Sequence, residues 1–129
     1  MSKRMLPAPA LWAAGALGSV LGFSTALAAD FPSGTFAVKQ APYTLTFDGK
    51  GQFHVYEDKT LQVSGSYSVK AGEVLFSDKA GPWACTKPGE ESGTYAWKYE
   101  AAVLTFNKIA DKCEDRVKSL INIAWKPQS

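Results

Sequence analysis

The sequence holds few of the residues on which enzymes and metal sites most often depend. Its 129 residues include one histidine, two cysteines and two methionines. The histidine, His54, alternates with the apolar residues Phe53 and Val55, and no partner for acid–base or nucleophilic chemistry can be located from spacing. The cysteines lack the Cys-x-x-Cys spacing and the paired histidines that are typical of redox and zinc sites. We therefore predict no catalytic residue, no metal site and no cofactor.

Continuous apolar runs of the ~20 residues that a membrane-spanning helix needs are also missing. The most apolar stretch, 11–21, follows the basic segment 2–4 and precedes Ala-Leu-Ala at 26–28. This order is typical of a secretory signal peptide, and the glycines within the stretch argue against the alternative, a membrane anchor. We expect residues 1–29 to be a cleaved signal peptide and residues 30–129 to be a single domain that is periplasmic or secreted.

The sequence also has almost no excess of charge of either sign. The chain carries 14 basic and 12 acidic residues. Lys3 and Arg4 lie in the predicted signal peptide, so the remaining domain has as many basic as acidic residues, and the two kinds are interspersed. Binding to nucleic acid requires a basic stripe. Nucleic-acid and anionic-membrane partners are therefore disfavoured.

The sequence does contain a five-residue motif that occurs three times: glycine, a small hydroxyl residue, an aromatic residue, any residue and an apolar or aromatic one. The copies lie at 34–38, 65–69 and 93–97, and each precedes a second short run that ends in Phe, at 43–47, 74–76 and 103–106. Alternating aromatic and polar residues favour strands with one buried face. The repeat therefore predicts antiparallel strand–turn–strand units.

The rest of the chain completes the pattern. An Asp-Gly turn at 48–51 precedes a further strand at 52–57, and Ile121, Ile123 and Trp125 alternate as a last strand. The connections are short, as sequential antiparallel neighbours require. We predict an all-β fold, a small up-and-down antiparallel barrel of about eight strands, because closure removes exposed strand edges. A two-sheet sandwich is the alternative.

One short helix interrupts the strands before the last of them. Asp111, Glu114 and Asp115 are three carboxylates within five residues, but they lack the ligand pattern and the glycine of a calcium loop. Asp111 and Glu114 have instead the spacing of a helix N-cap and its capping-box partner. We predict a helix over residues 111–120.

A long Pro/Gly-rich loop, 78–92, contains the first cysteine. An oxidising destination and an even count favour a Cys85–Cys113 disulfide over a redox or metal role. Trp83 lies in the same loop, and a large aromatic side chain there either packs beneath the disulfide or contacts a partner.

These motifs resemble a lipocalin-like (calycin-type) barrel, in particular small secreted bacterial domains with the G-x-Y-x-V repeat. The resemblance rests on that repeat, on Gly-Pro-x-x-Cys at 81–85 and on Asp-x-Cys-x-x-Arg at 111–116, although lipocalins carry Trp where Phe36 stands here. It implies a barrel that binds small apolar molecules. It also implies that Arg116 closes the barrel base over an aromatic residue, Phe36 or Trp125.

The sequence supports two hypotheses about function. The leading hypothesis is a secreted non-enzymatic binding protein for a small hydrophobic ligand. The alternative is a periplasmic interaction or inhibitor protein with a filled barrel that acts through loop 78–92, and strands of five to seven residues favour a filled interior. The candidate contact residues for a ligand or partner protein are aromatic: Trp83, Tyr95, Trp97, Tyr99 and Tyr67.

Overall fold

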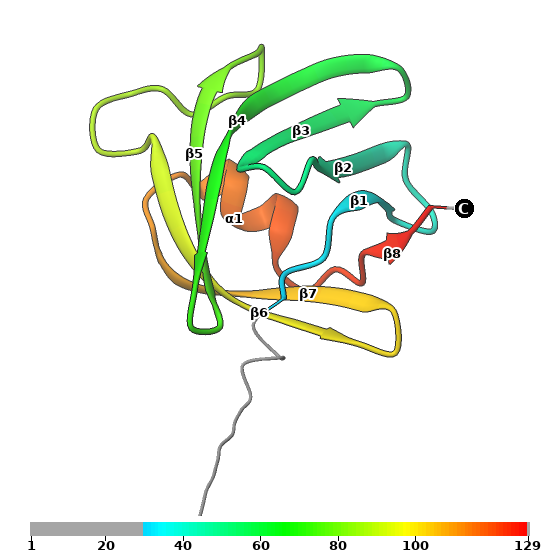
Figure 1. Cartoon of the computed structure of the whole chain (residues 1–129). Helices are drawn as coiled ribbons and strands as arrows, with labels where there is room; N and C mark the ends of the chain where they lie inside the picture. Colours follow the sequence, from blue (N-terminus) through cyan, green and yellow to red (C-terminus); the bar gives the residue numbers. More distant parts are fainter. Residues whose placement is uncertain (1–29, 129) are drawn as a thin grey trace, which may run out of the picture. The chain divides into compact units, whose positions relative to one another are not determined.

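The computed structural model of the chain describes residues 30–128, so the predicted signal peptide lies outside the described residues. Every helix and strand described belongs to the unit Pro32–Ser129. Eight antiparallel strands form a curled half-barrel with one short helix before the final strand, which confirms the predicted fold class (Figure 1). In chain order the elements are β1 (Gly34–Ala37), β2 (Tyr43–Phe47), β3 (Gln52–Glu57), β4 (Thr60–Lys70), β5 (Glu73–Ala80), β6 (Ser92–Glu100), β7 (Val103–Asp111), α1 (Glu114–Leu120) and β8 (Lys126–Pro127). Within this part of the chain, no helix is long and apolar enough to cross a membrane.

Consecutive strands from β1 to β7 are hydrogen-bonded neighbours, so their connections alternate between the two ends of the half-barrel. The segments 38–42, 58–59 and 81–91 lie at one end, which we call the loop end. The tight turns 48–51, 71–72 and 101–102 lie at the other, the turn end. This alternation decides which side chains can meet in one site.

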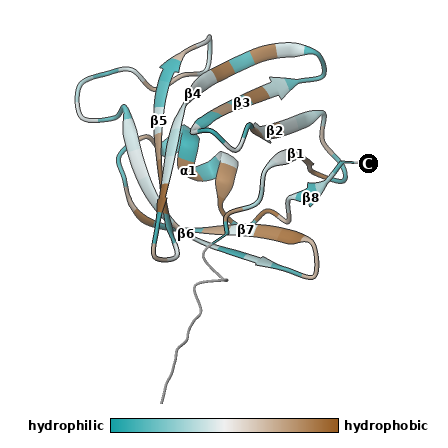
Figure 2. Cartoon of the chain, in the orientation of Figure 1, coloured by the Kyte–Doolittle hydropathy of each residue, from teal (hydrophilic) through white to brown (hydrophobic). Residues whose placement is uncertain are grey.

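Side chains alternate between the core and solvent along the strands, and the hydropathy colours alternate visibly along β4 (Figure 2). The buried hydrophobic side chains are those of Phe36, Leu45, Phe47, Phe53, Val63, Val74, Phe76, Tyr95, Leu104, Phe106, Cys113, Leu120 and Trp125. Most of their rings meet edge to face; Phe76, for example, contacts Phe53, Tyr95 and Phe106 at centroid distances of 5.2, 5.9 and 5.6 Å.

Two of the three repeat glycines are required by close approach. A Cβ atom at Gly65 would collide with the carbonyl oxygen of Ser77 on β5, and one at Gly93 would collide with the side chain of Asp111 on β7. Gly34 is different, because it has open space around it but a φ of +112°. The repeated motif therefore has a structural role, in strand packing and backbone conformation.

The predicted last strand over residues 121–125 is wrong. The N–H of Ile121 still donates to the carbonyl of Val117 in α1, and Asn122 has a left-handed φ of 58°, so the chain is not extended there. Strand β8 forms only at Lys126–Pro127, where it pairs with β1. Just before it, Trp125 exchanges two backbone hydrogen bonds with Leu104 of β7, at 2.8 and 3.0 Å. The C-terminal segment thereby links the two edges of the curled sheet.

The predicted helix start at Asp111 is also wrong. Asp111 still belongs to β7, where it pairs with Gly93 of β6. Cys113 is the N-cap of α1, and its sulfur accepts a hydrogen bond from the backbone N–H of Arg116 at 3.3 Å. The carboxylate of Asp111 is instead committed to other partners, which are described below.

Candidate functional site: a cavity at the loop end

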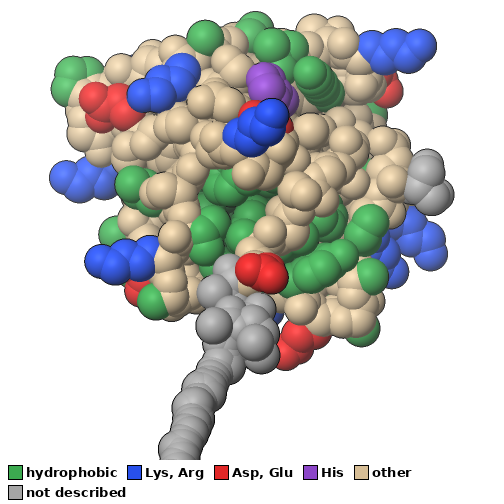
Figure 3. All heavy atoms as spheres, viewed as in Figure 1, with side chains coloured by type: hydrophobic (Ala, Val, Ile, Leu, Met, Phe, Trp, Pro, Cys, Tyr) green, Lys and Arg blue, Asp and Glu red, His purple; other side chains and the backbone are tan. Residues whose placement is uncertain are grey.

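A cavity of about 780 Å³ lies at the loop end, bounded by strands β2 to β5, α1 and loop 81–91. Its walls include buried apolar side chains such as Leu45, Phe53 and Phe76. In the space-filling view, hydrophobic side chains gather in the middle of the face shown, and charged ones lie mainly at its perimeter (Figure 3). An open cavity at this end differs from the interior filled along its whole length that the alternative hypothesis assumed.

Several strands are also longer than expected. The filled barrel was expected from strands of five to seven residues, but β4 has 11 residues, and β6 and β7 have nine each.

Two aromatic side chains lie at the mouth of the cavity. The rings of Tyr43 and Trp83 meet edge to face with centroids 5.7 Å apart, although 37% and 45% of these residues remain exposed. The backbone N–H of Trp83 donates to the carbonyl of Gln62 on β4 at 3.1 Å. Gly81 permits this approach, because a Cβ atom at that position would collide with the Gln62 backbone. Loop and strand therefore hold Trp83 over the cavity.

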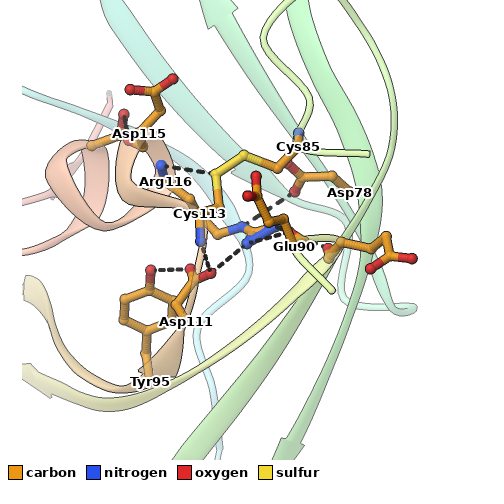
Figure 4. The surroundings of a disulfide bond; sticks show 10 residues. Asp78, Cys85, Glu90, Tyr95, Asp111, Cys113, Asp115 and Arg116 are labelled. Carbon is orange, nitrogen blue, oxygen red and sulfur yellow. Dashed lines mark hydrogen bonds and ion pairs between the residues drawn. A yellow bond between two sulfur atoms is a disulfide. The ribbon is translucent and has the colours of Figure 1, made fainter. Parts of the chain in front are cut away.

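A buried arginine, Arg116, forms part of the cavity wall. Figure 4 shows this side chain among its polar partners near the disulfide. Nη1 of Arg116 donates to Oδ1 of Asp111 at 2.8 Å, and both terminal nitrogens donate to the carbonyl of Glu90. Nη2 also donates to the carbonyl of Glu91 at 2.9 Å. Nε lies 3.5 Å from Oδ1 of Asp78. One side chain thus ties α1 to β5, β7 and the end of loop 81–91.

The two carboxylates beside Arg116 have further partners. Oδ2 of Asp78 accepts from the backbone N–H of Cys85 at 2.8 Å, and Asp111 accepts from the hydroxyl of Tyr95 and the N–H of Cys113. Burial raises the pKa of Asp78 despite the neighbouring guanidinium. Burial, together with the bond to Asp111, raises the pKa of Tyr95 far above its usual value.

The predicted disulfide is confirmed: Cys85 and Cys113 are bonded, with Cα atoms 6.3 Å apart. It joins loop 81–91 to the N-cap of α1. Since both segments contribute to the cavity wall, the disulfide holds part of the site together. A structural disulfide is consistent with an oxidising compartment.

The five predicted contact residues do not come together. Trp83 alone among them lines the cavity. Tyr95 is fully buried in the core, and Tyr67 and Tyr99 lie near the turn end. Trp97 lies there too, and its backbone N–H donates to the carbonyl of Gly72. Alternation along a strand identifies a shared face, but it does not tell which end of the barrel a residue occupies.

The three residues implied to close the barrel have separate roles. Phe36 is buried in the core, with its ring 6.2 Å from that of Phe47 and 6.0 Å from that of Tyr99. Trp125 links the sheet edges through its backbone and lines the cavity. The donors of Arg116 face carboxylates and carbonyls, which differs from the closure over an aromatic ring that the resemblance implied.

Asp78 and Tyr43 are cavity residues that the sequence interpretation missed. For Asp78 a signal existed, because Val74, Phe76 and Asp78 are alternate residues and all three are buried. The predicted run ended at residue 76, whereas β5 continues to Ala80. Tyr43 shares the buried face of Leu45 and Phe47 but lies at the start of β2, beside the loop end.

The single histidine contributes no catalytic arrangement to the cavity. His54 lies on β3, where it pairs with Thr46 and Ser64 and stacks on Tyr56 at 6.2 Å. Across residues 30–128, no group of three or more His, Cys, Asp and Glu side chains is placed to hold a metal ion.

Comparisons with protein-family models, with curated proteins and with solved structures found no match to this chain.

Proposed function

We propose that this protein is a secreted, non-enzymatic binding protein that holds a small apolar ligand in the cavity at the loop end. The observation that carries the proposal is the cavity itself. Its volume of about 780 Å³ falls within the ~300–1,000 Å³ typical of small-molecule sites. Mostly apolar walls with a few buried polar groups are also typical of such sites.

Secretion belongs to the same proposal. The apolar segment 11–21 with its basic start and small-residue end supports export. The Cys85–Cys113 disulfide supports an oxidising destination, the periplasm or the exterior. A lipocalin-like way of binding, inside a curled sheet, agrees with the resemblance of the motifs.

Fluorescence titration with N-phenyl-1-naphthylamine, an uncharged apolar probe, tests the proposal. We expect saturable one-to-one binding by the purified protein. Tyr43→Ala should weaken binding about fivefold, because an aromatic contact contributes ~1 kcal/mol. Tyr99→Ala is the matched control, since Tyr99 is 39% exposed, close to the 37% of Tyr43, but lies near the turn end. Non-saturable binding, or equal weakening by both variants, would contradict the proposal.

A further inference from the structure

The buried charges at the cavity are not balanced. Asp78 and Arg116 both line it, and each residue is 8% exposed. The side chain of Asp111, which is fully buried, contacts the same guanidinium. Two carboxylates therefore share one buried cation. The other charged lining residues, Lys87, Glu90, Asp115 and Lys118, are two of each sign, so they do not change the balance.

Four of the five N–H groups of Arg116 already make hydrogen bonds, and the fifth faces a carboxylate. A guanidinium carries five N–H groups. The four on Nη1 and Nη2 face Asp111 and the carbonyls of Glu90 and Glu91. The fifth, on Nε, makes no hydrogen bond but faces Oδ1 of Asp78 across 3.5 Å. An anionic ligand group in this part of the cavity would meet a carboxylate without gaining a cation.

A hydroxyl group suits the same surroundings. It donates one proton, which a carboxylate accepts, and it also accepts hydrogen bonds. The indole Nε1–H of Trp125, in the cavity wall, is a buried donor without a partner among residues 30–128. Since burying a polar group without a partner destabilises a complex, a ligand with both donor and acceptor capacity fits these residues better than a pure acceptor does.

Resting on the proposed function, we infer that the ligand is an uncharged molecule with an apolar body and a hydroxyl group, and that the cavity discriminates against carboxylates such as fatty acids. Asp78 is then the specificity-determining residue. Its carboxylate repels a ligand carboxylate and accepts from a ligand hydroxyl.

Competition between two ligands of equal chain length tests this inference. N-Phenyl-1-naphthylamine is displaced from the purified protein by 1-decanol or by decanoate at pH 8. We expect 1-decanol to compete at least tenfold more tightly than decanoate. Equal or tighter competition by decanoate would overturn the inference while the proposed function stands. Failure of the probe itself to bind would overturn both.

Two variants assign the preference to Asp78. Asp78→Asn keeps a side-chain oxygen for the N–H of Cys85 but removes the charge, so the preference for 1-decanol should fall at least threefold. Asp115→Asn is the matched control, because Asp115 is an exposed lining residue, and it should leave the preference within twofold. An unchanged preference in Asp78→Asn, with its folding verified by circular dichroism, would overturn the role of Asp78. If that variant does not fold, the comparison of the two ligands on the unmodified protein decides.

Discussion

Arg116 connects three strands or loops to α1 through polar contacts of one side chain. It lies on α1 and donates hydrogen bonds to Asp111 of β7 and to two carbonyls of loop 81–91, and it forms an ion pair with Asp78 of β5. All of this occurs in a buried setting, where each partner depends on the others. Its removal leaves Asp78 and Asp111 as buried carboxylates without a cation.

We expect Arg116→Met to reduce the free energy of unfolding by about 3–5 kcal/mol, because breaking a buried ion pair leaves an uncompensated charge. Urea unfolding followed by fluorescence measures this loss. Lys118→Met is the control on the same helix, since Lys118 is exposed, and it should change stability by no more than about 0.5 kcal/mol. A loss below ~1 kcal/mol in Arg116→Met would show that the carboxylates do not need the guanidinium.

Asp78 makes stability depend on pH in a defined direction. Burial raises its pKa above the ordinary 3.8, so the folded protein holds this proton at pH values where the unfolded chain has lost it. The contribution of Asp78 to stability is therefore greatest below pH 3.8 and falls as the pH rises through the folded-state pKa. We expect the stability difference between the unmodified protein and Asp78→Asn to decrease from about pH 3 to about pH 7 in urea unfolding. A difference that grows with pH would mean that Arg116 outweighs burial.

At the scale of elements, hairpins were the most predictable part of the fold. The predicted strands 43–47 and 52–57 coincide with β2 and β3, because alternation and an Asp-Gly turn are both local signals. Strands β4, β5 and β7 run past their predicted limits. The extra residues include Asp78 and Asp111, whose polar side chains are buried through contacts distant in sequence. Local hydropathy alone does not reveal such partners.

The turn between β6 and β7 contains residues that do not favour its backbone conformation. Ala101 and Ala102 have φ values of 53° and 61°, a conformation that Asn and Gly adopt at less cost than Ala. We expect Ala101→Asn combined with Ala102→Gly to raise the free energy of unfolding by about 1 kcal/mol. Urea unfolding is again the measurement.

A matched control for the turn variant is Ala110→Gly. Ala110 lies within β7, paired with Thr94, and φ is not positive there. Introducing glycine at this position should destabilise the protein by roughly 0.5–1 kcal/mol. If the turn variant were also destabilised, the left-handed alanines would not be the source of strain.

At the scale of the whole molecule, the sequence predicted the antiparallel sheet but not the cavity at its loop end. Alternation identified the inward face of each strand, and the expected content of that face was a packed core. Whether the core fills the interior depends on how the sheet curls and on where α1 and loop 81–91 pack, and neither is a local property. The same limit explains why Trp83 and Tyr43 were not expected to meet, since 40 residues separate them in the chain.

The disulfide links stability and binding across the whole molecule. Cys85→Ala with Cys113→Ser removes it, while the introduced hydroxyl keeps an acceptor for the N–H of Arg116 at the helix N-cap. We expect a loss of about 2–5 kcal/mol in the free energy of unfolding, because the unfolded chain is no longer constrained. We also expect at least fivefold weaker binding of N-phenyl-1-naphthylamine, since loop 81–91 carries Trp83 and is no longer anchored to α1.

Dithiothreitol should produce the same two changes in the unmodified protein and neither change in the variant. Lower stability with unchanged binding would instead mean that the bonds from Arg116 to Glu90 and Glu91 suffice to hold the loop over the cavity.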